Sequence, residues 1–167
     1  QVGALSATQV AALSVTQATT LSPEQVGGMS AAQIGGFTPT AIAGLEIDDI
    51  AMLSTTQLGG LTSSQVAGLA ATQIPALTTT QLSAFTSTQA SGFTSTQVGT
   101  LTVGQLAAMT STQVAALSTS AVGALATTQI AALSTTQIAG MTSTQFGALS
   151  ADQSAAFTGT QVSGFTA

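Results

Sequence analysis

One eight-residue motif repeats through the sequence without an insertion or a deletion. Written in eights from Leu5, the chain runs LSATQVAA, LSVTQATT, LSPEQVGG and so on to FTGTQVSG, which makes twenty full octads over residues 5–164. The consensus is [LMF]-[ST]-x-T-Q-[VIL]-x-[AG], and position one is Leu, Met or Phe in all twenty octads. Such strict self-similarity is typical of architectures in which each unit contacts its neighbours. Residues 1–167 are therefore interpreted as a single uninterrupted octapeptide-repeat array.

Positions two and five of the octad carry a helix-start signature. Position two is Ser or Thr in seventeen of the twenty octads, and position five is Gln in seventeen. A hydroxyl followed three residues later by Gln is a capping box, in which each side chain bonds the backbone N–H of the other residue. Positions one and six then become N′ and N4, so pairs such as Leu133 and Ile138 form a hydrophobic staple. Each octad is predicted to be one helix of about six residues.

The prolines support this register. Pro23 and Pro39 both fall at position three, which is N1, where a missing N–H costs nothing. Proline also disfavours the right-handed helical region for the preceding Ser22 and Thr38, which suits an N-cap. Pro75 falls at position seven, where its ring would clash with the carbonyl four residues earlier, so that octad is predicted to stop early or kink. Gly or Ala at position eight is expected to form the helix exit.

The preferred fold is all-α: a solenoid of about twenty short N-capped helices whose Leu and Val side chains meet along an inner seam. Isolated six-residue helices are unstable in water, so their order must come from contacts between units. A β-solenoid with 16-residue coils is an alternative favoured by the Thr, Val and Ile content, but positions one and six have opposite parity along a strand. In a single continuous helix the position-one stripe would drift by about 80° per octad and have no face to bury.

The composition excludes several functions. The chain has no Lys, Arg, His or Cys and only five acidic residues, for a net charge of -5. Without an imidazole, a thiolate or an amine, we expect neither an enzyme nor a bound cofactor. Without cations the chain cannot neutralise phosphates, so nucleic acid is not an expected partner. Mean hydropathy is +0.51, but no segment approaches the roughly 20 consecutive apolar residues of a spanning helix, so membrane insertion is not expected.

The one charged cluster lies in octad six, LEIDDIAM, at residues 45–52. Glu46, Asp48 and Asp49 form a weak candidate for a hard-cation site, because Ca²⁺ takes carboxylate and carbonyl oxygens. The favoured interpretation is that they occupy the N-cap, N2 and N3 positions, where negative charge stabilises a helix N-terminus. No catalytic, cofactor-binding or metal residue is therefore assigned. Met52, at the usually small position eight, marks a specialised unit that forms a bend or a lateral contact.

The polar columns have local and collective interpretations. The Gln column, including Gln57, Gln65 and Gln73, is assigned to local capping boxes in preference to a hydrogen-bonded ladder between units or copies. The Ser and Thr columns are assigned to caps and turns in preference to an ice-binding array or a glycosylated surface. Phenylalanines at position one are expected in the core: Phe85, Phe93, Phe157 and Phe165.

The uninterrupted L-[ST]-x-T-Q-[VI]-x-[AG] array resembles octapeptide tracts in very large repetitive surface and adhesin-like proteins of bacteria. The resemblance covers the whole chain and rests on this short motif. It implies a secreted or cell-surface structural role, and it carries no catalytic residue.

The expected function is that of an extracellular structural repeat protein that forms a rod, a stalk or a self-assembling filament. The array begins and ends in mid-octad, at Gln1 and Ala167, so we expect an excerpt of a longer array or a subunit whose ends join another copy. A surface of low charge lowers the barrier to association. The expected partners are copies of the chain itself, end to end or laterally. The alternative is an ice-binding or other surface-binding solenoid module.

Overall fold

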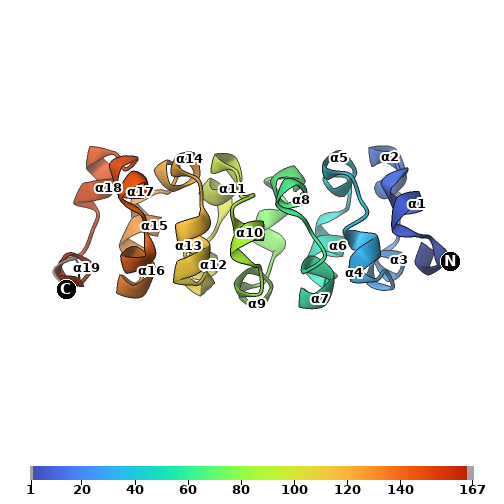
Figure 1. The fold of residues 1–167 in the computed structure, drawn as a ribbon, viewed down its shortest axis with the longest axis horizontal. Helices are drawn as coiled ribbons and strands as arrows, with labels where there is room; N and C mark the ends of the chain where they lie inside the picture. Colours follow the sequence, from blue (N-terminus) through green and yellow to red (C-terminus); the bar gives the residue numbers. More distant parts are fainter. Residues whose placement is uncertain (1, 165–167) are drawn as a thin grey trace.

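The computed structural model describes residues 2–164, which form an elongated solenoid of short helices (Figure 1). The two termini lie at opposite ends of its long axis. Within these residues the secondary structure consists of nineteen α-helices and two 3-10 helices, with no strand. The prediction of an α-solenoid is confirmed, and the β-solenoid and the continuous helix are both wrong.

Each octad contributes one helix, and the helices follow one another along the chain. Their bounds are η1 (Val2–Ala4), α1 (Ala7–Ala11), α2 (Val15–Ala18), α3 (Pro23–Gly27), α4 (Ala31–Ile34), α5 (Pro39–Ile42), α6 (Ile47–Met52), α7 (Thr55–Leu58), α8 (Ser63–Gly68), η2 (Ile74–Ala76), α9 (Thr79–Ser83), α10 (Ser87–Ala90), α11 (Ser95–Thr100), α12 (Val103–Ala108), α13 (Ser111–Ala116), α14 (Thr119–Gly123), α15 (Thr127–Ala132), α16 (Thr135–Gly140), α17 (Ser143–Gly147), α18 (Ala151–Ala155) and α19 (Gly159–Ser163).

The capping box forms as predicted. At α1, the Gln9 N–H donates to Ser6 Oγ at 3.2 Å, and the Ser6 N–H donates to Gln9 Oε1 at 2.8 Å. Ser6 itself has extended backbone angles, φ −72° and ψ 159°. A helical bond from Val10 N to Ser6 O at 3.0 Å follows, and a tighter turn from Leu13 N to Val10 O at 3.0 Å closes the unit. The octad is thus a single capped turn that restarts after eight residues.

The prolines lie where the register requires. Helices α3 and α5 begin at Pro23 and Pro39. Octad nine, which contains Pro75, forms only a turn followed by the 3-10 helix η2. Its N-cap position is Ala70, but Ala126 also lacks a hydroxyl and still precedes the six-residue helix α15. The missing N–H and the ring of Pro75 therefore account for the lost α-helix, as predicted.

The helix exits agree with the prediction only in part, because position eight is the C-cap of some helices, such as Ala12 and Gly28, but not of others. No residue in the range 2–164 has a positive φ, so Gly at position eight does not supply a left-handed cap. Its role is close packing: a Cβ on Gly60 would overlap the main chain of Ala31, and one on Gly92 would overlap that of Ser63. Both neighbours are N1 residues three octads earlier. Position eight is small because another turn of the solenoid approaches its backbone.

Helices three octads apart stack on one another. Helix α5 packs against α8, and α13 packs against α16. The stacks run along the rod, so that α2, α5, α8, α10, α13 and α16 pack on one another in succession. The helices α2, α5, α8, α11 and α14 lie along its upper edge in Figure 1. Hydrogen bonds between turns join residues 28 to 31 apart (for example), so one turn takes between three and four octads.

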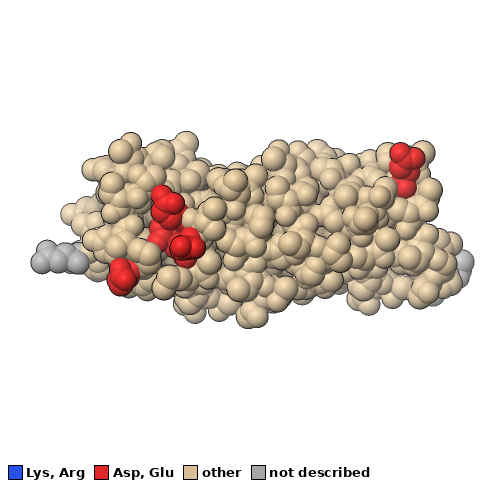
Figure 2. All heavy atoms as spheres, turned by 180° about the vertical axis from the view of Figure 1, so that it is seen from behind, with Lys and Arg blue, Asp and Glu red and all other residues tan. Residues whose placement is uncertain are grey.

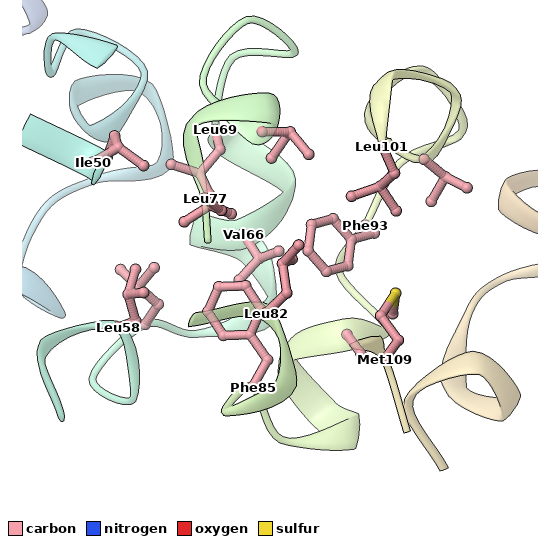
Figure 3. Packing of buried hydrophobic residues seen from close by; sticks show 14 of the residues in the cluster. Ile50, Leu58, Val66, Leu69, Leu77, Leu82, Phe85, Phe93, Leu101 and Met109 are labelled. Carbon is pink, nitrogen blue, oxygen red and sulfur yellow. The ribbon is translucent and has the colours of Figure 1, made fainter. Parts of the chain in front are cut away.

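The core is a continuous apolar seam built from positions one and six (Figure 3). Val66 and Leu82, both at position six, are fully buried, and the position-one residues between the two ends of the rod are nearly so. The rings of Phe85 and Phe93 pack at a centroid distance of 5.8 Å with a tilt of 60°. These two phenylalanines lie in the core as expected, Phe157 packs against it half-buried, and Phe165 lies outside the described residues.

Loss of several adjacent N-caps is expected to destabilise the array. The hydroxyls of Thr78, Thr86 and Thr94 each accept the N3 backbone N–H at 3.2 to 3.3 Å. Changing all three to Ala should cost about 1 kcal/mol per site and lower the melting temperature, measured by far-UV circular dichroism.

The matched control changes the N1 residues of the same octads, Thr79, Ser87 and Ser95, to Ala. These sites lie in the first helical turn and do not cap it, so this triple variant should melt close to the original chain. Equal destabilisation by the two triple variants would contradict the cap assignment.

Candidate functional site

The position-five glutamine joins two levels of structure. Gln97 accepts the Thr94 N–H at its Oε1 at 2.8 Å, which is the local capping bond. The Nε2 end of the same amide donates to Val66 O at 2.8 Å and to Leu69 O at 2.7 Å, on the preceding turn. The carbonyl 28 residues earlier and the one 31 residues earlier are thereby bonded from one side chain. We call these contacts inter-turn bonds.

Inter-turn bonds recur along the rod. Every position-five glutamine from Gln33 to Gln161 donates to the carbonyl 28 residues earlier, at 2.5 to 2.8 Å. Each of these side chains is buried. The local cap and the ladder between units were treated as alternatives in the sequence, but the structure contains both. The ladder runs from glutamine to main chain and not from glutamine to glutamine.

In the first turn of the array the position-five glutamines are not buried. Gln9 and Gln17 are exposed and Gln25 is half-buried, although all three make the capping bond. The residues 28 positions earlier would precede the first residue of the sequence. Burial of the glutamine therefore follows from stacking on a preceding turn and not from the capping box itself.

Three octads lack the glutamine and with it the inter-turn bond. Position five is Ala41 in octad five, Asp49 in octad six and Ala121 in octad fifteen. The first two are consecutive. The inter-turn bonds are therefore missing over two successive octads near the N-terminal end of the rod, although α5 and α6 still pack against α2 and α3.

The acidic cluster of octad six divides between surface and interior. Glu46 and Asp48 are exposed, whereas Asp49 is 1% exposed. Asp49 Oδ2 accepts the Glu46 N–H at 3.0 Å, so it replaces the glutamine in the capping bond. Asp49 Oδ1 is buried and has no hydrogen-bond partner. The assignment of N-cap, N2 and N3 positions to these residues agrees with the start of α6 at Ile47.

The carboxylates do not gather into a metal centre. Among residues 2–164 no group of three or more His, Cys, Asp or Glu side chains is placed to hold a metal ion. Burial raises the pKa of Asp49, the bond from the Glu46 N–H opposes this, and the charges of Glu46 and Asp48 raise it further. The Ser22 hydroxyl, which donates to Glu24 Oε2 at 2.8 Å, lowers the pKa of the exposed Glu24.

The surface is uncharged along most of the rod. The acidic side chains visible in Figure 2 gather near the end that holds the N-terminus, with one further group near the other end. Between Asp49 and Asp152 the sequence contains no charged residue. Met52 is 61% exposed and Ile47 is 45% exposed on the same helix, α6. No pocket is found in the described part of the chain.

Exposed hydroxyl groups recur along the surface at position four of the octad. Position four is Thr in most octads, and Thr88, Thr112 and Thr136 are exposed there. These three residues belong to α10, α13 and α16, which stack in succession. Some of these hydroxyls also bond the N-cap, as Thr112 does with Thr110 at 2.9 Å. In the range 2–164, none of the helices has the length and apolar character that crossing a membrane requires.

Comparison with known proteins identifies the repeat family. The family model of the ALTTAQ repeat matches residues 42–79, 103–135 and 122–160, which together make up more than half of the chain. The chain therefore belongs to the ALTTAQ repeat family. No curated protein and no solved structure matches it. The link to adhesin-like octapeptide tracts is not shown by these comparisons.

The inter-turn bond can be tested by exchanging its donor for an acceptor. Gln97→Glu keeps the oxygen that accepts the Thr94 N–H but places a second oxygen against the carbonyls of Val66 and Leu69. A buried polar group without a partner costs about 1–3 kcal/mol, and more when charged. We expect a clear fall in melting temperature at pH 7.

Gln17→Glu is the matched control, because Gln17 makes the same capping bond, from Ser14 N–H at 2.8 Å, but is exposed. A carboxylate near a helix N-terminus is favourable, so this variant should melt at or slightly above the original temperature. If both variants lose the same stability, the inter-turn bond does not hold the turns together.

Proposed function

We propose that this chain is a structural rod, part of a stalk or self-assembling filament in a secreted or cell-surface repeat protein of the adhesin-like kind. The observation that carries the proposal is the inter-turn bond, which recurs from Gln33 to Gln161 with nearly constant length. A bond of this kind fixes the distance between successive turns along the axis. At about 8–10 Å between packed helices, five to six turns give a rod of about 50 Å.

The surface supports association of such rods with one another. Charged side chains repel at short range and keep proteins apart, and the uncharged stretch between Asp49 and Asp152 lacks this barrier. Copies of the same chain are therefore the proposed partners, laterally or end to end. The absence of Lys and Arg also leaves trypsin-like proteases no cleavage site in residues 1–167, which suits an extracellular fibre. No catalytic activity is proposed.

Negative-stain electron microscopy and sedimentation velocity of the purified chain over a range of concentrations test the proposal. We expect rods at low concentration and lateral or end-to-end assemblies at high concentration. The triple variant Thr88→Glu, Thr112→Glu and Thr136→Glu places three charges along one stack of helices. It should reduce lateral assembly at low salt, and added salt should restore it because salt screens exposed charges.

The fold is expected to tolerate these substitutions, since position four is already acidic at Glu24, Asp48 and Asp152. The neutral control changes the same three threonines to Gln and should assemble like the original chain. Dispersed monomers of the original chain at high concentration would contradict self-assembly.

A second candidate function is binding to ice or to another ordered surface. The exposed threonines at position four favour it, because stacked helices repeat them along the rod in a fixed order. Thermal hysteresis of the purified chain is the measurement, and the expected result is a hysteresis that disappears in the Thr88, Thr112 and Thr136 triple Gln variant. A chain without hysteresis removes this candidate and leaves the rod unaffected.

A further inference from the structure

The site of interest is the place beneath position five, where carbonyls of the preceding turn converge. In octad seven, Gln57 Nε2 lies 3.2 Å from Val26 O, 3.2 Å from Gly27 O and 2.8 Å from Met29 O. These are the residues 31, 30 and 28 positions earlier. Three acceptors thus face a single amide nitrogen, and the amide supplies the hydrogens.

Octad six has an acceptor at the position where the octads with a buried glutamine have this donor. By the same spacing of 31, 30 and 28 residues, the carbonyls expected beneath Asp49 are those of Ala18, Thr19 and Leu21. Asp49 Oδ2 makes the capping bond that a glutamine oxygen makes elsewhere. Its Oδ1 therefore takes the side of the amide nitrogen, where it is buried without a partner. An ionised oxygen facing carbonyl oxygens is unfavourable in an environment from which water is excluded.

We propose that Asp49 is a neutral carboxylic acid in the folded chain at acidic pH, and that its Oδ1–H donates to a main-chain carbonyl of the preceding turn. A proton restores the hydrogen that the glutamine amide supplies in other octads, and it adds no volume. The contact between octads five and six and the turn before them then depends on a proton. We call this contact the acid-dependent joint.

The charged groups around Asp49 act in the same direction. Glu46 and Asp48 lie on its own helix, α6, and α3, which packs against α6, carries Glu24. Helix η2 also packs against α6, and neither it nor α2 contains a titratable side chain. All neighbouring charges are therefore negative. Burial raises the pKa of Asp49, and the charges of Glu46 and Asp48 raise it further.

Because of the position of the joint, protonation of Asp49 determines whether a hydrogen bond connects the turns there. Ala41 and Asp49 occupy position five in consecutive octads, so no glutamine amide connects the turns between Gln33 and Gln57. When Asp49 ionises, the one remaining donor at this level is lost. The joint should then open more readily than the rest of the rod, which would remain bonded by glutamines. This inference concerns the joint alone and does not rest on the proposed rod function.

The sign of the pH dependence follows from the raised pKa. The stabilising contribution of Asp49 is complete below the unfolded value of about 3.9 and is lost as the pH rises through the higher folded value. Glu24 acts oppositely, because its pKa is lowered in the fold and its contribution is lost on acidification. Asp49→Asn is the decisive variant, since its amide can donate to the same carbonyls at every pH.

The experiment combines a carboxyl NMR titration of the original chain with hydrogen exchange at pH 4 and pH 7, corrected for intrinsic exchange rates. Asp49 should titrate above the usual range of an aspartate carboxyl. Amides of octads two, three, five and six should lose protection at pH 7 in the original chain but not in Asp49→Asn. At pH 7 this variant should melt about 2–4 °C higher, whereas Asp48→Asn, at an exposed site, should not.

Two results would overturn the proposal. One is a titration of Asp49 within or below the usual range of an aspartate carboxyl, accompanied by the same pH profile in the original chain and in Asp49→Asn. The other is a rise in the melting temperature at pH 7 on adding CaCl₂ or KCl that Asp49→Asn abolishes, which would assign the carbonyls and Asp49 to a cation. If Asp49→Asn does not fold, Asp49→Gln, the consensus residue, replaces it in the same comparison.

Discussion

The hydrogen bond from a glutamine amide to the main chain of the preceding turn is the interaction on which the architecture depends. Helices of four to six residues have no stability of their own. The capping box orders each one locally, but it says nothing about where the next turn of the solenoid lies. A buried amide accepts the N-cap N–H with its oxygen and donates to the preceding turn with its nitrogen. It therefore fixes both the start of its own helix and the position of that helix on the preceding turn. Each such hydrogen bond makes a net contribution of about 1 kcal/mol to the free energy of unfolding, and these contributions add along the rod.

Local structure was predictable because its signals are local. Ser or Thr with Gln three residues later, Pro23 and Pro39 at N1, and Pro75 at position seven each carry a backbone constraint that the structure obeys. The buried pair at positions one and six followed from the same register. These features depend on residues within one octad, so a single repeat contains the information for them.

The features that join turns were less predictable. Gln was assigned to the capping box, which accounted for the motif, and the second end of the amide was left without a partner that the sequence could name. Its partners lie 28 to 31 residues away, and that distance depends on how many octads make a turn. For the same reason Gly60 and Gly92 were assigned to helix exits, whereas they admit the backbone of a distant octad. The buried, unpartnered oxygen of Asp49 follows from the inter-turn contact and could not be deduced from octad six alone.

The turn of this solenoid is not a whole number of repeat units, and this affects how the array can change in length. Each buried glutamine meets carbonyls of positions six and one of earlier octads, and every octad offers these two carbonyls. Gain or loss of one octad by recombination would exchange every partner for an equivalent one eight residues away. Arrays of this kind can therefore vary in steps of a single octad, much finer than a full turn. Insertion or deletion of a single residue, in contrast, would move each amide away from the carbonyls that it bonds.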